Sequence, residues 1–399
     1  MFVTRSQLLA FRTRRQYLAL DAQGRTPEDV FTILRELQPF PPIAGSMPGS
    51  APHPRSRIVD YKDEWSQQWR AAGRLVKGRF MNGNVAYVTN VDFALYAAAF
   101  RRPLSEPLPR PALHILDLLE QDGPLPKFIL RELSKLERGS FERTLMSLNR
   151  AFEVMEIQRE VDWESPWDLR QRAYPSVNLD ACEQADTQAE VLCCFTKAFG
   201  PASVSEISDW SGWSQRTIRN LLDNLLTRRD VIRIEVEGQT DSAYLASDEI
   251  DMLSAVKPVN TFLTVLPSND PFVLPQWSCF KKQYQPYRLP YCYGVIVLDG
   301  EIAGAAWGRY KRRYIHIEEL NLNPSIVHDS PQMNKVLAAL ESHVSDGWVP
   351  IHIYGINGEA EATWVREILE RNGFVWNAGY YLKEATQPKS LVLSANSAT

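Results

Sequence analysis

The chain has 399 residues, of which 44% are apolar, 11% aromatic and 23% charged, a composition typical of globular proteins with two to four compact units. No run of eighteen apolar residues occurs and residues 1–20 contain four arginines, so the sequence predicts neither a membrane span nor a signal peptide, and we expect a cytoplasmic protein. Five cysteines without Cys-x-x-Cys spacing and six histidines without ligand spacing argue against a disulfide framework and a zinc site, so we expect no metal.

Positive charge is concentrated near the N-terminus. Residues 1–110 hold 16 lysines and arginines against 9 acidic residues, although the whole chain holds 44 against 48 and has a net charge of −4. Such a basic segment attracts a phosphate backbone, while acidic surfaces elsewhere limit non-specific binding. The alternative interpretation is that these arginines lie on solvated helix faces and bind nothing.

The first quarter of the chain predicts an irregular helix-turn-helix unit over residues 1–105. Residues 3–20 carry apolar side chains at helical spacing behind Thr4, a favourable N-cap residue. A second helix is expected to begin after Thr26 and to end near Leu37, because prolines follow.

A loop rich in Pro, Gly and Ser follows over residues 39–54. Beyond it the sequence predicts a helix over 60–69 and a hairpin over 75–87 that turns at Asn82-Gly83. The Asn-Gly tip could enter a minor groove, although such a turn occurs in any hairpin.

Two later stretches share one plan. In each, a Gly-Pro pair opens a helical stretch, a second helix follows, and a strand begins at a valine 31 residues after the glycine, from Gly123 to Val154 and from Gly200 to Val231. Short helices followed by a strand and a wing are typical of a winged helix, whose second turn helix usually reads a DNA groove. We therefore predict winged helices over 111–175 and 186–250, with nucleic acid as the first partner to consider.

From residue 258 the pattern changes to short strands and two helices, which predicts an α+β domain over 258–385. The expected elements are strands over 262–266, 293–298, 302–310, 314–322 and 349–354, and helices over 330–345 and 360–372. The polar tail, 386–399, is expected to be disordered.

Several of these stretches match a known pattern in the same order. They are Arg12-Thr13-Arg14-Arg15-Gln16-Tyr17-Leu18, Leu34-Arg35-Glu36-Leu37-Gln38, Arg57-Ile58-Val59-Asp60-Tyr61, Trp167-Asp168-Leu169-Arg170-Gln171-Arg172 with Pro175, Gly200-Pro201-Ala202-Ser203 with Asp209-Trp210-Ser211-Gly212, and Leu266-Pro267-Ser268-Asn269-Asp270-Pro271-Phe272. Together they resemble the bacterial winged-helix DNA glycosylases of the AlkZ and YcaQ type, which unhook interstrand crosslinks and excise alkylated bases. The resemblance covers nearly the whole length.

The resemblance implies a basic DNA channel built from three winged helices and a β-rich, barrel-like C-terminal domain, without a metal or an organic cofactor. It also implies hydrolysis of an N-glycosidic bond by a Gln-apolar-Gln or Gln-apolar-Asp motif at the end of the second helix. Gln38 stands at the first motif position, but Phe40 stands where the second Gln or Asp belongs. A phenyl ring can neither hold a water nor offer a negative charge to the sugar. Asp60, Asp63 or Glu64 could replace the missing residue if the fold brings one of them to the same pocket.

Further residues are candidate DNA contacts. Phosphate contacts are expected from arginines of the basic segment that would flank Gln38, which are Arg12, Arg14, Arg15, Arg55 and Arg57. The third winged helix offers Gln215, Arg216 and Arg219, whose side chains suit base edges and phosphates. A predicted hairpin tip offers Arg309, Lys311, Arg312 and Arg313 interleaved with tyrosines, which suits phosphates and an exposed base. For each set the alternative is a solvated surface that binds nothing.

The sequence leaves two functions open on this α+β scaffold of tandem winged helices. One is a DNA glycosylase that hydrolyses the N-glycosidic bond of alkylated or crosslinked bases in DNA repair. The other is a regulator or repair accessory that binds DNA without catalysis. No Gly-rich phosphate loop precedes a helix, so no nucleotide cofactor is expected, and we expect a monomer.

Overall fold

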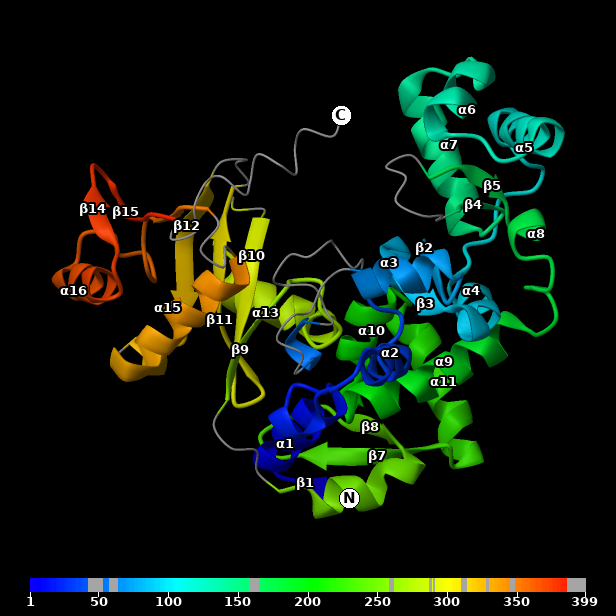
Figure 1. The fold of residues 1–399 in the computed structure, drawn as a ribbon. Coiled ribbons are helices and arrows are strands. Elements are labelled where there is room, and N and C mark those ends of the chain that lie inside the picture. The colour runs from blue at the N-terminus through cyan, green and yellow to red at the C-terminus, as the bar shows by residue number, and fades with distance from the viewer. Residues whose placement is uncertain are drawn as a thin grey trace. The chain divides into compact units, whose positions relative to one another are not determined.

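The structure is a computed structural model that describes residues 1–41, 53–56, 64–157, 165–257, 262–286, 289, 291–309, 314–327, 330–344 and 349–385. Helices and strands both contribute, and the described residues fall into two compact units (Figure 1). The first unit takes its residues from 1–8, 24–44 and 57–255, and the second from 9–23, 45–56 and 256–399. The predicted α+β class is confirmed.

The first unit begins with the N-terminal elements. They are β1 (Phe2–Val3), the start of α1 (Arg5–Arg15), α2 (Pro27–Glu36), α3 (Glu64–Ala71), β2 (Leu75–Arg79), the short turn η3 (Met81–Gly83), β3 (Val85–Thr89), the 3-10 turn η4 (Asn90–Asp92) and α4 (Phe93–Phe100). Thr26 caps α2 by accepting a hydrogen bond from the Asp29 N–H, and the helix ends at its C-cap Leu37, as predicted. The hairpin of β2 and β3 is also confirmed.

The same order of elements then occurs twice. The first copy comprises α5 (Arg110–Asp122), α6 (Lys127–Ser134), α7 (Arg138–Arg150), β4 (Val154–Glu156), β5 (Trp167–Leu169) and the short α8 (Arg170–Ala173). The second comprises α9 (Gln184–Phe199), β6 (Ala202–Ser203), α10 (Val204–Ser211), α11 (Gln215–Arg228), β7 (Val231–Val236) and β8 (Ala243–Ala246), followed by η5 (Ser247–Glu249) and α12 (Ile250–Ala255). Figure 1 shows α5, α6 and α7 gathered beside the β4–β5 pair.

The two copies also agree in detail. Gly123 and Gly200 end α5 and α9 with φ of 79° and 98°, a left-handed region that favours glycine. Two residues after each glycine the chain pairs with the second strand of the hairpin, Leu125 with Trp167 and Ala202 with Tyr244. This agreement supports the predicted repeat. The assignment of each copy as a winged helix, and the predicted domain boundaries, stay predictions.

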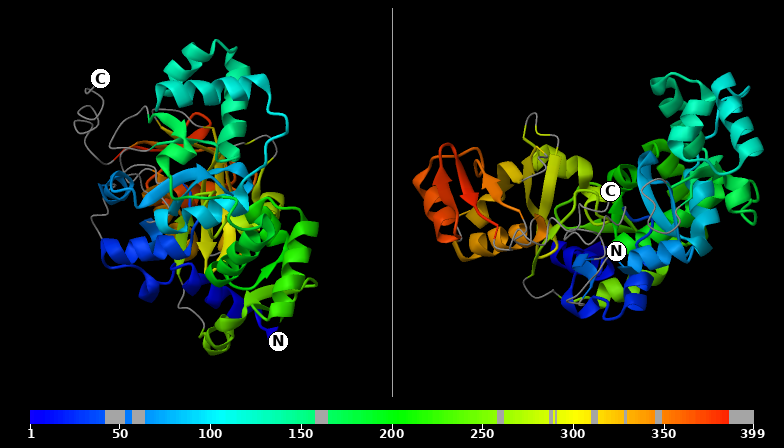
Figure 2. Two further views of the ribbon diagram at one scale, coloured as in Figure 1. Left: turned by 90° about the vertical axis from the view of Figure 1, so that its right-hand side faces the viewer. Right: turned by 45° about the horizontal axis from the view of Figure 1, so that its top comes forward.

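The second unit is built on a seven-stranded sheet in the order β14-β15-β13-β12-β11-β10-β9. Its strands are β9 (Leu263–Leu266), β10 (Tyr291–Leu298), β11 (Glu301–Gly308), β12 (Ile315–Leu322), β13 (Ile351–Ile353), β14 (Val375–Asn377) and β15 (Tyr380–Lys383). The other elements are η1 (Leu20–Ala22), η2 (His53–Arg55), η6 (Leu274–Gln276), α13 (Trp277–Tyr284), α14 (Pro324–Val327), α15 (Ser330–Val344) and α16 (Thr363–Arg371). Figure 2 shows the sheet and its helices from two further sides.

Both faces of the central strands are buried. In β10, Ile296 packs in one core with α15 and α16, while its neighbours Val295 and Val297 pack in another with Phe280 of α13 and Leu18 from the N-terminal stretch. A strand buried on both faces reads as a continuous apolar run, which is how residues 295–298 appear in the sequence. The second unit is therefore a layered α+β domain.

The structure differs from the sequence predictions in three respects. Among the described strands, β9 and β14 each pair with one neighbour only, so the sheet is open and is not the predicted barrel-like form. Several elements were not predicted, among them the helices α4, α5, α9 and α13 and the hairpin of β14 and β15. The helix expected over 3–20 is shorter, because α1 ends at Arg15. The predicted tail, 386–399, lies outside the described residues.

Candidate active site

Gln38 lies directly after α2 and is 7% exposed. Its Oε1 accepts a hydrogen bond of 2.8 Å from the backbone N–H of Thr89, which fixes the orientation of the amide. Its Nε2 then donates to Oδ2 of Asp92 at 2.8 Å. A further hydrogen bond joins Gln38 to the hydroxyl of the buried Tyr96. The amide is thus held against a carboxylate that follows it by 54 residues.

Asp92 ends η4 and occupies the N-cap position of α4. An aspartate at an N-cap usually accepts a hydrogen bond from the first turn of its helix, but the Asp92 side chain makes no such capping bond. Its Oδ2 instead accepts from Arg35 Nε at 2.9 Å, from Gln38 and from Thr89 Oγ1 at 2.7 Å. From the described residues, Oδ1 accepts only a long contact of 3.5 Å from Arg35. The three short hydrogen bonds therefore all go to Oδ2, whereas Oδ1 can accept a further hydrogen bond.

The charge state of this site follows from its contacts. Burial raises the pKa of Asp92, but the hydrogen bonds from Arg35, Gln38 and Thr89 together outweigh burial and leave that pKa below its ordinary value. Asp92 is consequently ionised at neutral pH. Burial raises the pKa of Tyr96 well above its ordinary value, so the adjacent hydroxyl stays neutral.

Phe40 lies outside this constellation. It is fully buried in a core with Val30, Leu34 and Tyr87, and its ring stacks on that of Tyr87 at a centroid distance of 6.1 Å. Two backbone hydrogen bonds, of 3.0 and 2.8 Å, tie Phe40 to Tyr87. The residue at the second motif position is thus a core residue that places Gln38 beside the β2–β3 hairpin.

The carboxylates that the sequence offered in place of the missing motif residue stay predictions. Asp60 and Asp63 lie outside the described residues, and Glu64 begins α3 with a side chain that is likewise not described. The structure brings Asp92 to Gln38 instead. Nothing in the sequence pattern indicated this residue, because no helix was predicted over residues 93–100.

A sequence model of the family described as DNA glycosylase AlkZ-like matches residues 52–344. The chain belongs to the AlkZ-like DNA glycosylase family. Among solved structures, the Streptomyces sahachiroi DNA glycosylase AlkZ is similar with a TM-score of 0.63 at 16% sequence identity, covering 88% of this chain and 100% of that chain. No curated protein sequence matches. The AlkZ-like family makes DNA the partner and a DNA-repair glycosylase the type of function, and the structural likeness supports the fold.

Five arginines near the N-terminus were predicted to contact DNA phosphates. For two of them, Arg55 and Arg12, the prediction is wrong because their side chains are buried. Arg55 is fully buried, and its guanidinium donates to both carboxylate oxygens of Asp270 at 2.7 and 2.8 Å and to the Gln16 carbonyl at 2.9 Å. Arg12 is only 4% exposed. Neither side chain offers its charge to a phosphate, because both are packed inside the second unit.

The other predicted contacts remain accessible or undescribed. Arg14 is 42% exposed and pairs with Asp21, and Arg15 is partly buried. On α11, Gln215, Arg216 and Arg219 are all exposed, with Arg219 donating to Gln215. Arg309 is 65% exposed and pairs with Glu318. Contact of these residues with DNA stays a prediction. Arg57, Lys311, Arg312 and Arg313 lie outside the described residues.

Two further features of the described residues concern ligands and membranes. Within the described ranges, no group of three or more His, Cys, Asp or Glu side chains is placed to hold a metal ion. No helix in the same ranges combines the length and the apolar character needed to cross a bilayer.

Proposed function

We propose that this chain is a working DNA glycosylase that hydrolyses the N-glycosidic bond of an alkylated or crosslinked base, with Asp92 in the role that its family assigns to the second motif residue. The observation that carries the proposal is the 2.8 Å hydrogen bond between Gln38 and Asp92. It restores a glutamine beside a carboxylate, although Phe40 interrupts the motif in the sequence.

The chemistry asks for a fixed negative charge near C1′ of the sugar. As the bond from C1′ to the base breaks, the base leaves with the bonding electrons and the sugar gains oxocarbenium character. The ionised Asp92 stabilises that charge and accepts a hydrogen bond from the attacking water through its open oxygen Oδ1. When the water adds to C1′, its proton passes to the carboxylate and then to solvent. Gln38 and Thr89 hold the carboxylate in place throughout.

The competing hypothesis is a DNA-binding protein without catalysis. It is favoured by the low exposure of Gln38, whose amide is occupied by protein contacts on both sides. A labelled duplex that carries an alkylated base separates the two hypotheses. A glycosylase leaves an abasic site that breaks only after alkali, whereas a binder shifts the duplex in a gel and leaves every base attached.

Replacing Asp92 by Asn tests the role of the carboxylate directly. The amide keeps the size of the side chain but removes the charge, so we expect base release to fall by a factor of about 10² to 10³ while duplex binding is retained. Asp117→Asn, an exposed change on α5, serves as the matched control and is expected to leave release unchanged. Equal rates for the wild type and Asp92→Asn would refute the assignment.

A further inference from the structure

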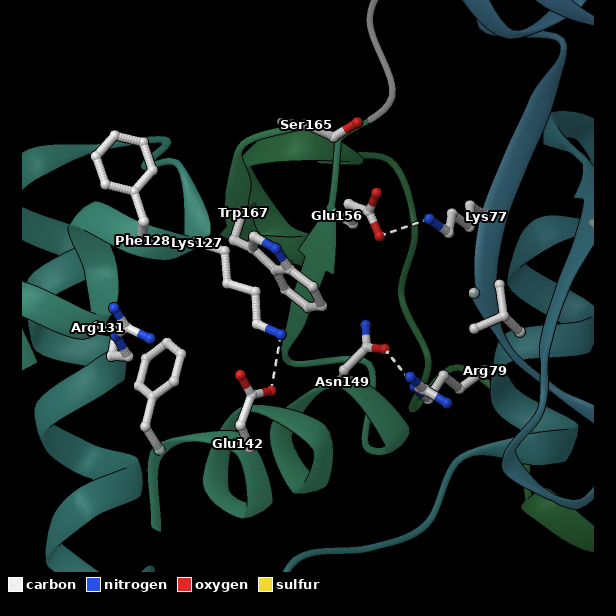
Figure 3. Close-up of a pocket in the computed structure, with 13 residues that line it drawn as sticks. Lys77, Arg79, Lys127, Phe128, Arg131, Glu142, Asn149, Glu156, Ser165 and Trp167 are labelled. Carbon is white, nitrogen blue, oxygen red and sulfur yellow. Dashed lines mark hydrogen bonds and ion pairs between the residues drawn. The ribbon is translucent and has the colours of Figure 1, made fainter. Parts of the chain in front are cut away.

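A second site lies in the first unit, away from Gln38. A cavity of about 500 Å³ opens between α6, the β4–β5 pair and the β2–β3 hairpin (Figure 3). Its size is within the range of about 300 to 1,000 Å³ that is usual for pockets holding small organic ligands. The side chains that matter here are Lys77, Arg79, Lys127, Arg131, Phe128 and Trp167.

The pocket carries an excess of positive charge. Four cationic side chains line it against two carboxylates. Lys77 pairs with Glu156 at 2.6 Å and Lys127 with Glu142 at 2.7 Å, so the two lysines are neutralised locally. The two arginines, Arg79 and Arg131, exceed the acidic groups of the lining and favour an anionic ligand.

The two arginines differ in how they are held. Arg79 donates to the neutral Oδ1 of Asn149 at 3.2 Å and to the Gly83 carbonyl at 3.1 Å. Burial and the neighbouring charge of Arg150 lower the pKa of Arg79. An anion bound in the pocket would raise that pKa again, because it stabilises the charged guanidinium. Arg131 is exposed, and no ion pair joins it to a described residue. The exposed Arg131 can thus hold a phosphate bidentately, and Arg79, whose Nε and Nη1 already donate, can add a contact through Nη2.

Aromatic rings supply the other half of the site. Phe128 on α6 is 45% exposed, and Trp167 is only partly buried. Figure 3 shows Trp167 in the middle of the pocket with the Lys127 side chain extending past it. Every nucleobase has a π-face that stacks on such rings regardless of sequence.

The first turn of α6 adds to this environment. The helix begins at Lys127 behind Pro126, and no side chain caps its N-terminus. Its first residues, Lys127 and Phe128, line the pocket. The partial positive charge of an uncapped N-terminus therefore acts in the same direction as the arginines.

We propose that this pocket binds one unpaired nucleotide of a DNA strand, with its base stacked on Trp167 and Phe128 and its two flanking phosphates held by Arg131 on one side of the pocket and by Arg79 on the other (Figure 3). This assignment rests on the proposed function in one respect: it takes the ligand to be a part of DNA. It concerns a nucleotide other than the one whose base is released, because Gln38 and Asp92 lie elsewhere.

One hairpin connects the two sites. Val85, at the start of β3, lines the pocket, and Thr89, at the end of the same strand, donates its N–H to Gln38. Four residues of extended chain separate them by about 13 Å along the strand. A DNA strand that places a damaged nucleotide at Asp92 can therefore offer a nearby unpaired nucleotide to the pocket.

Binding of single-stranded DNA tests this inference without any chemistry. The probe is a fluorescein-labelled oligodeoxythymidylate of about 12 nucleotides, followed by fluorescence anisotropy. The double variant Phe128→Ala with Arg131→Gln is expected to bind it at least about tenfold more weakly, because one stacking surface and one phosphate contact are lost. The matched control, Leu133→Ala with Arg138→Gln, removes an exposed apolar side chain and an arginine of the same repeat outside the pocket. We expect the control to stay within about twofold of the wild type.

A second measurement reports on the ring in the pocket. The oligonucleotide is expected to quench tryptophan fluorescence in the wild type, and this quenching should shrink in Trp167→Phe. Equal affinity of the pocket variant and the control, or unchanged quenching in Trp167→Phe, overturns the inference. Loss of base release in Asp92→Asn with intact oligonucleotide binding separates the two sites. If the wild type releases no base, the proposed function is refuted. If the pocket variant nevertheless binds the oligonucleotide more weakly than the wild type does, the inference about the pocket is supported.

Discussion

At the scale of single residues, the site depends on one acid that the chain supplies from an unexpected place. Gln38 could be named from the sequence because the resemblance to the family places its motif after the second helix, whose bounds Thr26 and the prolines after Leu37 predict. Asp92 could not, because a contact between residues 54 apart leaves no local pattern. The pairing of Phe40 with Tyr87 and the hydrogen bond from Thr89 to Gln38 bring the end of α2 beside the hairpin that leads to Asp92.

The lowered pKa of Asp92 makes a prediction about stability and pH. A carboxyl group whose pKa is lower in the folded state than in the unfolded chain stabilises the fold above its ordinary pKa of about 3.9. That contribution is lost as the pH falls through the folded-state value. The difference in unfolding free energy between the wild type and Asp92→Asn should therefore be constant from about pH 8 to pH 5 and shrink on further acidification. Urea titrations across this range measure it. A difference that grows toward low pH would contradict the assigned direction.

Completing the family motif at Phe40 should harm the protein. Phe40→Asp places a carboxylate where a ring is fully buried, so we expect a loss of at least about 3 kcal/mol of unfolding free energy and no gain in base release. Chemical denaturation compares it with Phe2→Asp, a change at a residue that is 63% exposed and is expected to cost little. A stable Phe40→Asp protein with faster base release would mean that the motif acts in its usual register.

At the scale of elements, the sequence was informative wherever a cap or a breaker marked a boundary. The helix α2 begins after Thr26 and ends at its C-cap Leu37, as predicted, and Gly123 and Gly200 mark the same point in each repeat. The sequence failed at α13, which follows the proline-rich turn after Leu266 and shows too short an apolar pattern. It also failed to indicate that the tip of the β2–β3 hairpin packs against the end of α10, since contacts between elements have no periodicity.

That contact predicts the effect of a single methyl group. A Cβ at Gly212 would lie 2.7 Å from the Asn82 Cα, and Gly212 has a φ of 73°. Gly238 has nearly the same φ, 74°, but nothing within 4 Å of such a Cβ. Both changes to Ala carry the backbone strain of a left-handed residue, about 1 kcal/mol. Gly212→Ala should cost clearly more than Gly238→Ala in thermal unfolding, because only the former displaces the hairpin. Equal losses of stability in the two variants would show that the tip of the β2–β3 hairpin moves aside at no cost in free energy.

At the scale of the whole molecule, the second unit is held together by a buried ion pair. Arg55 and Asp270 are both fully buried, and the carboxylate also accepts from the Phe272 N–H at 2.8 Å. Asp270 belongs to the stretch from Leu266 to Phe272 that carried part of the resemblance, so one of its roles here is structural. The sequence could show both residues but not their pairing, which joins positions 215 apart.

Removing one partner of this pair is expected to be costly. Asp270→Asn leaves a guanidinium buried without its counter-charge, so the unfolding free energy should fall by about 3 to 5 kcal/mol. Glu28→Gln, which breaks the solvent-exposed pair with Arg74, provides the control, and we expect a loss below about 1 kcal/mol. Denaturant melts of both variants measure the difference. Comparable losses of unfolding free energy in the two variants would indicate that the Arg55–Asp270 pair contributes no more than an exposed ion pair does.

The make-up of the second unit also has a consequence during synthesis. Described residues from 9–23 and 53–56 belong to it, together with strands that begin at Leu263 and end at Lys383. The early segments leave the ribosome long before the strands of the same unit. Arg55 therefore lacks its ion-pair partner until Asp270 has been synthesised. Nascent chains arrested before the last strand should therefore keep this N-terminal stretch open to proteases, and protection should be complete only after the strand that ends at Lys383 has emerged.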